Sequence, residues 1–177
     1  MEFDITSDDS VGEALDTIAE EHGKAIASVV HLAAYFDFSG EDSPAYDAVN
    51  VEGTRRLLTA LDERFDIGQF VYSSTMLVHA PTEPGDPIDE NHPLEARWAY
   101  PRSKLETEKV IDAAETDFPR VVLRLAGVYT EDSGVPTLTH QIQRIYERQA
   151  QSHLFSGDPA RGQSFVHRDD VIDAIAR

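Results

Sequence analysis

The sequence predicts an α/β fold with a parallel sheet. Apolar runs at residues 26–33, 70–74 and 121–126 have the length of buried strands, and a segment with helical apolar spacing follows each of them. Strands that alternate with helices in this way are typical of a parallel sheet covered by helices. The chain has 177 residues, 41% of them hydrophobic, which is enough for a single domain with its own core.

The first elements follow from local signals. Phe3–Ile5 is interpreted as the end of a strand. Helical spacing comes next, with Ser7 or Ser10 as the expected cap and Gly23 as the stop. Ile26–Ala33 is a near-continuous apolar run, which predicts a strand buried on both faces.

The later elements follow from the same signals. Pro44 suits the first position of a helix that extends through Leu61. Residues 75–98 form a long connection rich in proline, and a loop of this length inside a compact domain is usually functional. The other expected elements are a strand at Phe70–Ser74, a helix from Tyr100 to about Glu115, a strand at Val121–Ala126, a helix at Leu138–Gln149 and a last helix with Asp169 as its N-cap.

The composition excludes several classes of function. A net charge of −18 argues against binding to nucleic acid or to a membrane surface, because both partners are anionic. The acids are spread along the whole chain, and Lys24, Lys104 and Lys109 are its only lysines. This pattern favours a surface adapted to high salt, where self-repulsion is screened, and the alternative is an ordinary acidic protein.

Other signals are absent from the sequence. Without cysteine the chain has no disulfide, no thiolate nucleophile and no Cys-ligated zinc site. The seven histidines show no metal-binding spacing, so no metal is expected. The apolar runs are too short to span a bilayer, and the acidic N-terminus does not resemble a signal peptide. We therefore expect a cytoplasmic protein.

Tyr100 and Lys104 are the pair that most suggests chemistry. A spacing of four places both side chains on one helical face, and a nearby ammonium favours the phenolate and lowers the pKa of a tyrosine. A base useful at neutral pH needs the tyrosine pKa lowered by about three units, or about 4 kcal/mol. A lysine, a bound cationic cofactor and a dry pocket together could supply this. The alternative is a solvated pair, which occurs by chance on many helices.

Six segments in order along the chain strengthen the chemical interpretation. They are Val30–Ala34, Asn50–Thr54, Val71–Thr75, Tyr100–Lys104, Leu123–Tyr129 and Phe165–Asp170. Together they resemble the extended short-chain dehydrogenases/reductases of the NAD-dependent epimerase/dehydratase family, from about Phe3 to the C-terminus. The resemblance implies a Rossmann-like parallel sheet with flanking helices and the cofactor NAD, with NADP not excluded. It also implies a small-molecule substrate such as a nucleotide sugar, and a homodimer.

The resemblance also implies roles for individual residues. Tyr100 would be the general acid/base, Lys104 would lower its pKa and bind the nicotinamide ribose, and Thr75 would bind the reacting oxygen. Cofactor contacts are implied for Tyr100 and Lys104 and for Asp4, Ile5, His31, Ala33, Ala34, Asn50, Ser73, Ser74, Leu125, Ala126, Gly127 and Val128. Substrate contacts are implied for Thr75, Met76, Arg161 and His167.

Structural roles are the alternatives for several of these residues. Ser73, Ser74 and Thr75 could simply end a strand, and Asn50 could be an ordinary helix residue. His31, within an apolar run, is expected to be structural rather than a metal ligand. Gly157 and Gly162 are expected to form turns rather than a phosphate cradle.

The chain also departs from the family pattern. No Gly-x-x-Gly-x-x-Gly turn is present, and Gly12 and Gly23 stand alone. We therefore expect one partial domain over residues 1–177, truncated at the N-terminus by two strands and incomplete in its substrate-binding part at the C-terminus. Such a chain would be a fragment, a truncated gene model or a chain completed by a partner, and the Ile26–Ala33 strand would have an unpaired edge.

Two functional hypotheses remain open. The first is an NAD(P)-dependent epimerase or reductase. Dehydration is less expected, because Met76-Leu77 stands where sugar-nucleotide dehydratases carry an Asp-Glu pair. The alternative is a non-catalytic or fragmentary member that keeps the fold without cofactor turnover.

Overall fold

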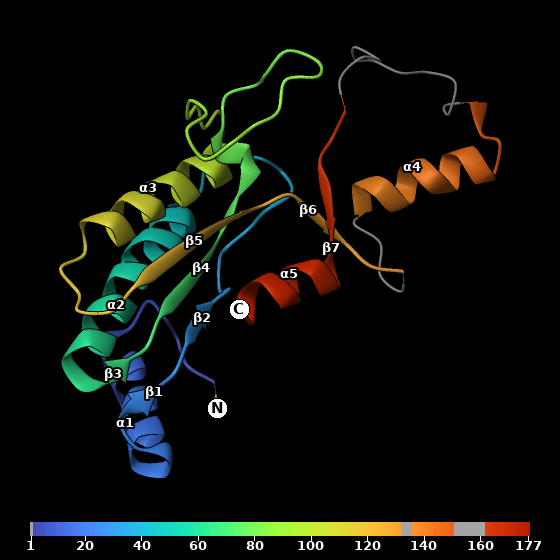
Figure 1. Ribbon diagram of the computed structural model, residues 1–177. Helices are drawn as coiled ribbons and strands as arrows, with labels where there is room; N and C mark the ends of the chain where they lie inside the picture. The colour runs from blue at the N-terminus through green and yellow to red at the C-terminus, as the bar shows by residue number, and fades with distance from the viewer. Residues whose placement is uncertain (1, 132–135, 151–161) are drawn as a thin grey trace. The chain divides into compact units, whose positions relative to one another are not determined.

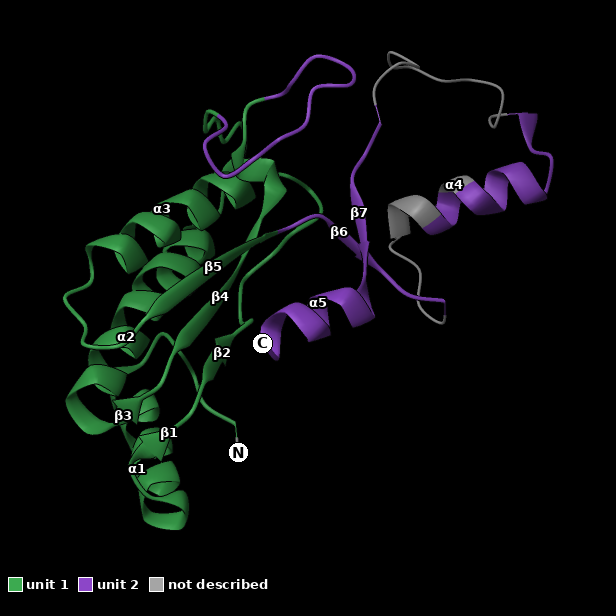
Figure 2. Ribbon diagram, in the orientation of Figure 1, with its two compact units in different colours: residues 1–80, 93–124 green, residues 81–92, 125–177 purple. Residues whose placement is uncertain are grey.

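The computed structural model describes residues 2–131, 136–150 and 162–177, which form two compact units. Figure 2 shows the first unit, residues 1–80 and 93–124, in green, and the second, residues 81–92 and 125–177, in purple. The expectation of a single domain over residues 1–177 stays a prediction.

The first helix of the first unit has the boundaries that its capping residues predict. Helix α1 spans Asp8–His22, and the Ser7 hydroxyl accepts a hydrogen bond from the Ser10 backbone N–H at 3.2 Å. Ser7 is therefore the N-cap, which decides between the two serines that the sequence offered. Gly23 ends the helix with a φ of 82°, in the region that favours glycine.

The second helical segment contains a π-helix that the sequence did not predict. Helix η1, Tyr46–Glu52, continues directly into α2, Gly53–Arg64. The Gly53 N–H bonds to the Ala48 carbonyl, five residues back, as in a π-helix. The Asn50 carbonyl accepts from two threonine hydroxyls, Thr54 at 2.6 Å and Thr107 at 3.1 Å. Side chains from two helices thus stabilise the wider turn around Asn50.

A parallel sheet lies at the centre of the first unit. Strands β2 (Val29–His31), β4 (Phe70–Thr75) and β5 (Arg120–Leu125) follow in the order β2-β4-β5. Strands β2 and β4 run parallel, with Val29 opposite Phe70 and His31 opposite Tyr72. Helices α2 and α3 (Ala99–Ala113) lie side by side on one face of this sheet (Figure 1). The α/β class with a parallel sheet is confirmed.

The predicted strand at Phe3–Ile5 is wrong. The Asp4 carboxylate accepts from the Thr6 N–H at 2.8 Å and from the Thr6 hydroxyl at 2.7 Å. The Ser7 N–H donates to the Asp4 carbonyl at 3.1 Å. These local bonds give the backbone a turn in place of a strand ladder, because short polar side chains compete with sheet hydrogen bonds.

The run Ile26–Ala33 is not one strand buried on both faces. It forms β1 (Ala25–Ile26), which pairs in parallel with β3 (Asp66–Ile67), and then β2. Val30 is 40% exposed and Leu32 is 59% exposed. Strand β2 stands at one end of the described strand order, with β4 as its neighbour, so its side chains are covered less completely than those of β4. The apolar pattern alone could not distinguish an end strand from a central one.

The hydrophobic core of the first unit lies between the sheet and its helices. Helix α1 contributes Val11 and Leu15 to this core, and α2 contributes three leucines. The remaining members come from the strands, from α3 and from the connections between them: Phe65, Ile67, Phe70, Tyr72, Ile111 and Phe118. The core therefore fixes α3 against β4, which positions the residues described below.

The second unit contains a two-stranded parallel sheet and two helices. Strand β6 (Gly127–Tyr129) pairs with β7 (Phe165–His167), with Gly127 opposite Phe165. A Cβ at residue 127 would lie 2.8 Å from the Phe165 ring, so this close pairing requires glycine. Helix α4 spans Pro136–Tyr146, slightly earlier than predicted, and α5 spans Arg168–Ile175.

The N-cap predicted at Asp169 is wrong by two residues. His167 caps α5, and its side chain accepts from the Asp169 N–H at 3.3 Å. Asp169 instead lies in the first turn, where an acidic side chain also suits the helix dipole. Among the described residues, no helix has both the length and the apolar character needed to cross a bilayer.

Candidate active site

Tyr100 and Lys104 lie in the first two turns of α3, beside the end of β4. Lys104 is only 2% exposed, and its Nζ donates a hydrogen bond to the Ser73 carbonyl at 2.8 Å. The same Nζ lies 4.7 Å from the centroid of the Tyr72 ring and 5.8 Å from that of the Tyr100 ring. The ammonium is thus held against two aromatic faces by cation–π attraction. The predicted juxtaposition of Tyr100 and Lys104 is confirmed.

The electrostatics of the pair differ from the prediction. Burial lowers the pKa of Lys104 to about 8, although the Glu108 carboxylate acts in the opposite direction. Burial, and then the neighbouring Tyr46, raises the pKa of Tyr100. The expected lowering of the Tyr100 pKa is therefore wrong for the chain alone. The desolvation of the buried phenol dominates, and Lys104 lies against the ring face of Tyr100.

Thr75 is the last residue of β4 and is 7% exposed. Its hydroxyl accepts from the Leu77 N–H at 3.3 Å and caps the short 3₁₀ helix η2, Met76–Val78, which packs against α3. The chain returns through backbone hydrogen bonds of 2.8 Å, from the Ala80 N–H to the Pro93 carbonyl and from the Glu95 N–H to the Val78 carbonyl. Thr75 and Met76 are thereby fixed at the carboxyl end of the sheet, where ligands of open α/β sheets bind.

Asn50 connects the loop after β2 to α3. Its amide group donates to the Tyr35 carbonyl at 3.1 Å and to the Ser103 hydroxyl at 2.9 Å, while its Oδ1 accepts from the Tyr35 N–H at 2.7 Å. Ser103 in turn donates to the Tyr100 carbonyl at 2.8 Å. Asn50 therefore supports the Tyr100 turn from within the core, and it is more than an ordinary helix residue.

His31 is a core residue. It is 4% exposed, its Nε2 lies 2.9 Å from the Thr54 hydroxyl, and its ring stacks on Tyr72 with centroids 5.7 Å apart. Burial, and then the charge of Lys104, lowers the pKa of His31 to about 4, so the ring is neutral at neutral pH. By contrast, Ala33 and Ala34 follow β2 as exposed, small residues. The cofactor contact predicted for this segment is therefore better suited to the two alanines than to the His31 side chain.

An aromatic pair beside Tyr100 was missed by the sequence reasoning. The Phe36 ring lies 4.8 Å from the Tyr100 ring at 79°, and the Phe38 ring lies 4.7 Å from the Phe36 ring at 83°. Both are exposed, Phe36 by 47% and Phe38 by 76%. The signal was present as three aromatic residues within Tyr35–Phe38, directly after Ala33-Ala34.

A buried ion pair under Lys104 was also missed. Glu108 is 8% exposed and accepts from Arg124, with Nη2 to Oε2 at 2.7 Å and Nε at 3.2 Å from each carboxylate oxygen. The Ser74 hydroxyl donates to the same carboxylate. Glu108 follows Lys104 by four residues, as Lys104 follows Tyr100. This spacing places all three side chains on one helical face and could have predicted the position of Glu108 from the sequence.

Several remaining predicted residues belong to other parts of the described chain. Asp4 and Ile5 lie against the start of α2, where Arg56 Nη1 donates to the Ile5 carbonyl at 2.8 Å. Leu125 to Val128 and His167 belong to the second unit. There the His167 ring lies 5.3 Å from the Tyr129 ring and 3.5 Å, through Nε2, from the Glu131 carboxylate. Arg161 and Gly157 lie outside the described residues.

The described residues show which groups could hold a ligand. No cluster of three or more His, Cys, Asp or Glu side chains within them is placed to bind a metal. An ammonium carries three donors, and Ser73 takes one donor of Lys104. The donor chemistry of Lys104 and Tyr100, with exposed Ala33 and Ala34 in the segment after β2, suits the hydroxyl-rich ribose and the flat ring of a nicotinamide nucleotide.

Comparison with known proteins assigns the family. The model of the NAD dependent epimerase/dehydratase family matches residues 1–177. The chain belongs to this family. The curated protein "Putative UDP-glucose 4-epimerase" of Methanocaldococcus jannaschii is 29% identical over 163 residues, which are 85% of this chain and 51% of that protein.

Two solved structures share the fold. The Bordetella bronchiseptica enzyme WbmG, in complex with NAD and UDP, is 22% identical with a TM-score of 0.76, over 100% of this chain and 53% of its own. The UDP-glucuronic acid 4-epimerase of Bacillus cereus, in complex with UDP-glucuronic acid and NAD, is 23% identical with a TM-score of 0.72. The match covers 96% of this chain and 51% of that chain. The Rossmann-like fold is thus confirmed, and the chain spans about half the length of these relatives.

Proposed function

We propose that this member of the epimerase/dehydratase family is an NAD(P)-dependent epimerase or reductase that acts on a nucleotide sugar. The observation that carries the proposal is the placement of Tyr100 on α3, with the buried Lys104 ammonium against its ring and Thr75 fixed at the end of the adjoining strand. Related structures in complex with NAD and UDP, or with NAD and UDP-glucuronic acid, support the choice of cofactor and substrate class.

Each residue has a defined part in this proposal. The Tyr100 hydroxyl exchanges a proton with a hydroxyl or carbonyl of the substrate, and Thr75 orients the same oxygen by hydrogen bonding. Lys104 contributes positive charge beside Tyr100 and offers donors to ribose hydroxyls. When bound, the nicotinamide supplies the hydride chemistry. Asn50 and Ser103 hold the backbone of the Tyr100 turn in place.

One sequence feature favours a second candidate function. The 177 residues contain no Gly-x-x-Gly-x-x-Gly turn, which in this family holds the cofactor pyrophosphate at a helix N-terminus. A non-catalytic member that keeps the fold without cofactor turnover is therefore the alternative. The choice between NAD and NADP, the homodimer, the high-salt surface and the cytoplasmic location stay predictions.

Cofactor binding separates the two candidates. Trp98 is the only tryptophan, lies two residues before Tyr100 as the N-cap of α3, and is 40% exposed. Titration with NADH, followed by energy transfer from Trp98 to the dihydronicotinamide, should report binding at this site. Saturable transfer supports the enzyme, whereas no transfer at millimolar NADH supports the non-catalytic alternative.

Tyr100→Phe tests the catalytic assignment. Loss of a general acid/base typically reduces the rate by about 10²- to 10⁴-fold. We expect a loss of this size in the interconversion of UDP-glucose and UDP-galactose, with NADH binding retained. Tyr146→Phe is the matched control, because Tyr146 is 87% exposed in the second unit. Turnover that is equal in the Tyr100→Phe variant and the parent protein rejects the role of Tyr100.

A further inference from the structure

Helix α3 is attached to the end of β4 by two consecutive side-chain contacts. Lys104 donates to the Ser73 carbonyl at 2.8 Å, and Glu108, one turn later, accepts from the Ser74 hydroxyl. Neighbouring residues of one strand thus bind neighbouring turns of one helix. Because of this geometry the Glu108 carboxylate lies on the same helical face as Lys104 and Tyr100, at steps of four residues.

The Glu108 carboxylate is buried and oriented from two sides. Its side chain is 9% exposed, and Arg124 on β5 binds both of its oxygens, with Nη2 to Oε2 at 2.7 Å. The Ser74 hydroxyl supplies a further bond from β4. A carboxylate with partners on two strands cannot swing toward solvent, so its charge stays at a constant place relative to Lys104.

We propose that Glu108 is a positioning residue that acts through Lys104: its buried carboxylate keeps the Lys104 ammonium charged and docked on Ser73, beside Tyr100. The proposal concerns electrostatics within the first unit alone. Its meaning for catalysis rests on the proposed function, in which the charge of Lys104 favours the phenolate of Tyr100.

The charges around Lys104 support this assignment. Burial opposes the ammonium and lowers its pKa to about 8, and Glu108 is the group that acts in the opposite direction. Among the described residues, Tyr72, Tyr100 and His31 also face Lys104, and none of them carries a negative charge at neutral pH. Burial raises the pKa of Tyr72 on β4 and of Tyr100 on α3, and burial lowers the pKa of His31 on β2. Arg124 lies beyond Glu108 and partly neutralises it.

The number of lysines makes a direct measurement possible. The chain has three, and Lys24 and Lys109 are exposed whereas Lys104 is buried. Lysine labelled with ¹³C at Cε therefore gives three NMR signals, and their pH titration reports each ammonium without cofactor, substrate or turnover. In Glu108→Gln, which keeps the shape and an acceptor for Ser74, we expect the titration of Lys104 to move down by about one pH unit.

Two further variants distinguish an electrostatic role from a purely structural one. Glu106→Gln is the matched control, because Glu106 is exposed on α3 and pairs with Lys109 at 2.7 Å; it should leave the Lys104 titration unchanged. Arg124→Gln removes the guanidinium that offsets Glu108, so the Lys104 titration should move to higher pH. A structural role would destabilise both the Glu108 and the Arg124 variants, but it would not shift Lys104 in opposite directions.

The outcomes are separable. A Lys104 titration that is the same in Glu108→Gln and Glu106→Gln overturns the proposal. If Glu108→Gln does not fold, Arg124→Gln decides by itself: an upward shift supports the proposal, and no shift overturns it. If the protein is an active enzyme, the alkaline limb of its kcat-versus-pH profile should move to lower pH in Glu108→Gln. If NADH does not bind, the proposed function fails, but the NMR titration of Lys104 still tests the role of Glu108.

Discussion

At Tyr100 the protein surroundings oppose the charge that a base would need. Burial and the neighbouring Tyr46 raise the pKa of Tyr100, and Lys104 lies 5.8 Å from the centre of its ring. The phenol is therefore protonated in the chain alone and is ready to act as an acid. In the proposed reaction, the positive charge of a bound oxidised nicotinamide is the missing contribution that favours the phenolate.

His31 makes stability depend on pH in a defined window. Its pKa falls from 6.5 to about 4 on folding, so the unfolded chain binds the proton more tightly. The contribution is present above pH 6.5 and is lost as the pH falls toward 4. At about 1.4 kcal/mol per pKa unit, it amounts to about 3 kcal/mol.

Substitution of His31 should reduce this acid sensitivity. Gln retains hydrogen-bonding groups that can serve the Thr54 hydroxyl, which lies 2.9 Å from His31 Nε2, but it does not titrate. We expect the free energy of unfolding of His31→Gln to decline less between pH 6.5 and 4 than that of the parent chain, by about 3 kcal/mol. Urea unfolding at several pH values measures this. His22→Gln is the control because His22 is exposed, and parallel curves for the parent and His31→Gln would contradict the assignment.

Among the elements, α3 determines the candidate site. Its inner face carries Tyr100, Lys104 and Glu108 toward β4, and Ser103 and Thr107 toward the Asn50 turn of η1. One helix therefore receives fixed contacts from a strand on one side and from a π-helix on the other. The side chains at the start of α3 are held by the tertiary structure, since its N-cap, Trp98, provides no side-chain hydrogen bond.

The first helix offers a test of its capping residue. Ser7 accepts the Ser10 N–H as the N-cap of α1, whereas the Ser10 hydroxyl accepts the Asp4 N–H at 2.9 Å, outside the helix. Ser7→Ala should lower the free energy of unfolding by about 1 kcal/mol, as expected for the loss of a serine cap. Ser10→Ala is the matched variant and should cost less, because the bond that it removes is exposed. Chemical unfolding of both variants measures the difference. A larger loss of unfolding free energy in Ser10→Ala than in Ser7→Ala would contradict the assignment of Ser7 as the N-cap.

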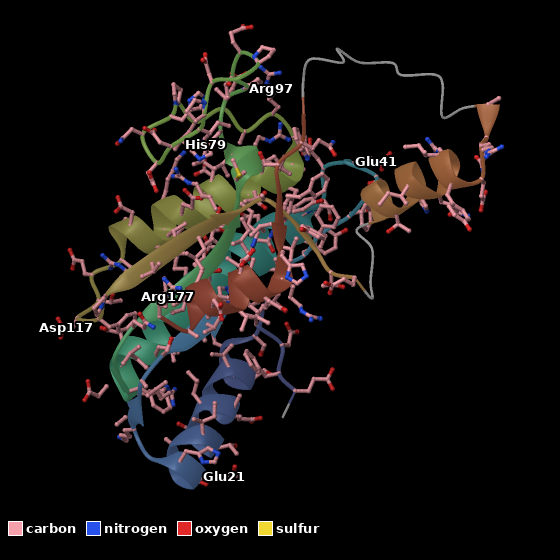
Figure 3. All side chains as sticks on the ribbon, turned by 45° about the vertical axis from the view of Figure 1, so that its right-hand side comes forward. Glu21, Glu41, His79, Arg97, Asp117 and Arg177 are labelled. Carbon is pink, nitrogen blue, oxygen red and sulfur yellow. The ribbon has the colours of Figure 1, made fainter. Side chains whose placement is uncertain are left out.

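At the scale of the whole molecule, the dominant property is charge. The net charge is −18, and Glu21, Glu41 and Asp117, which are labelled in Figure 3, are exposed acids on three separate segments of the first unit. Charges spread in this way repel one another over distances of about a Debye length, which is ~10 Å at 0.1 M salt and ~3 Å at 1 M. The folded chain bears this repulsion more than the expanded unfolded chain does.

Salt should therefore stabilise the folded protein. We expect the thermal midpoint to rise as KCl increases from ~0.1 M to ~1 M, most steeply at the lower concentrations where screening changes fastest. Calorimetry at constant pH measures the midpoint. Sucrose at matched osmolality is the control, because it acts through exclusion from the protein surface and not through screening. A midpoint that stays constant or falls with KCl would contradict the expected adaptation to high salt.

The sequence by itself determined the α/β class, the strand at residues 70–74, the end of α1 at Gly23 and the start of the Tyr100 helix, whereas the structure chose Ser7 over Ser10 as the α1 cap. These features depend on signals within a few residues, namely apolar periodicity, a serine cap and a glycine stop. The pairing of Tyr100 with Lys104 was also predictable, because a spacing of four is a local property of a helix.

Only the tertiary structure decided how that pair behaves. The Lys104 side chain is buried where α3 packs against β4 and donates to the Ser73 carbonyl. Glu108 accepts a hydrogen bond from Arg124, sixteen residues later in the chain, and Asn50 donates one to Ser103, fifty-three residues later. Tertiary contacts also accompany the π-helix around Asn50, whose carbonyl accepts from the Thr107 hydroxyl of α3, and burial with the neighbouring Tyr46 raises the Tyr100 pKa. Burial and charge add up over residues that are far apart in the chain, so their balance at one side chain cannot be worked out from local sequence.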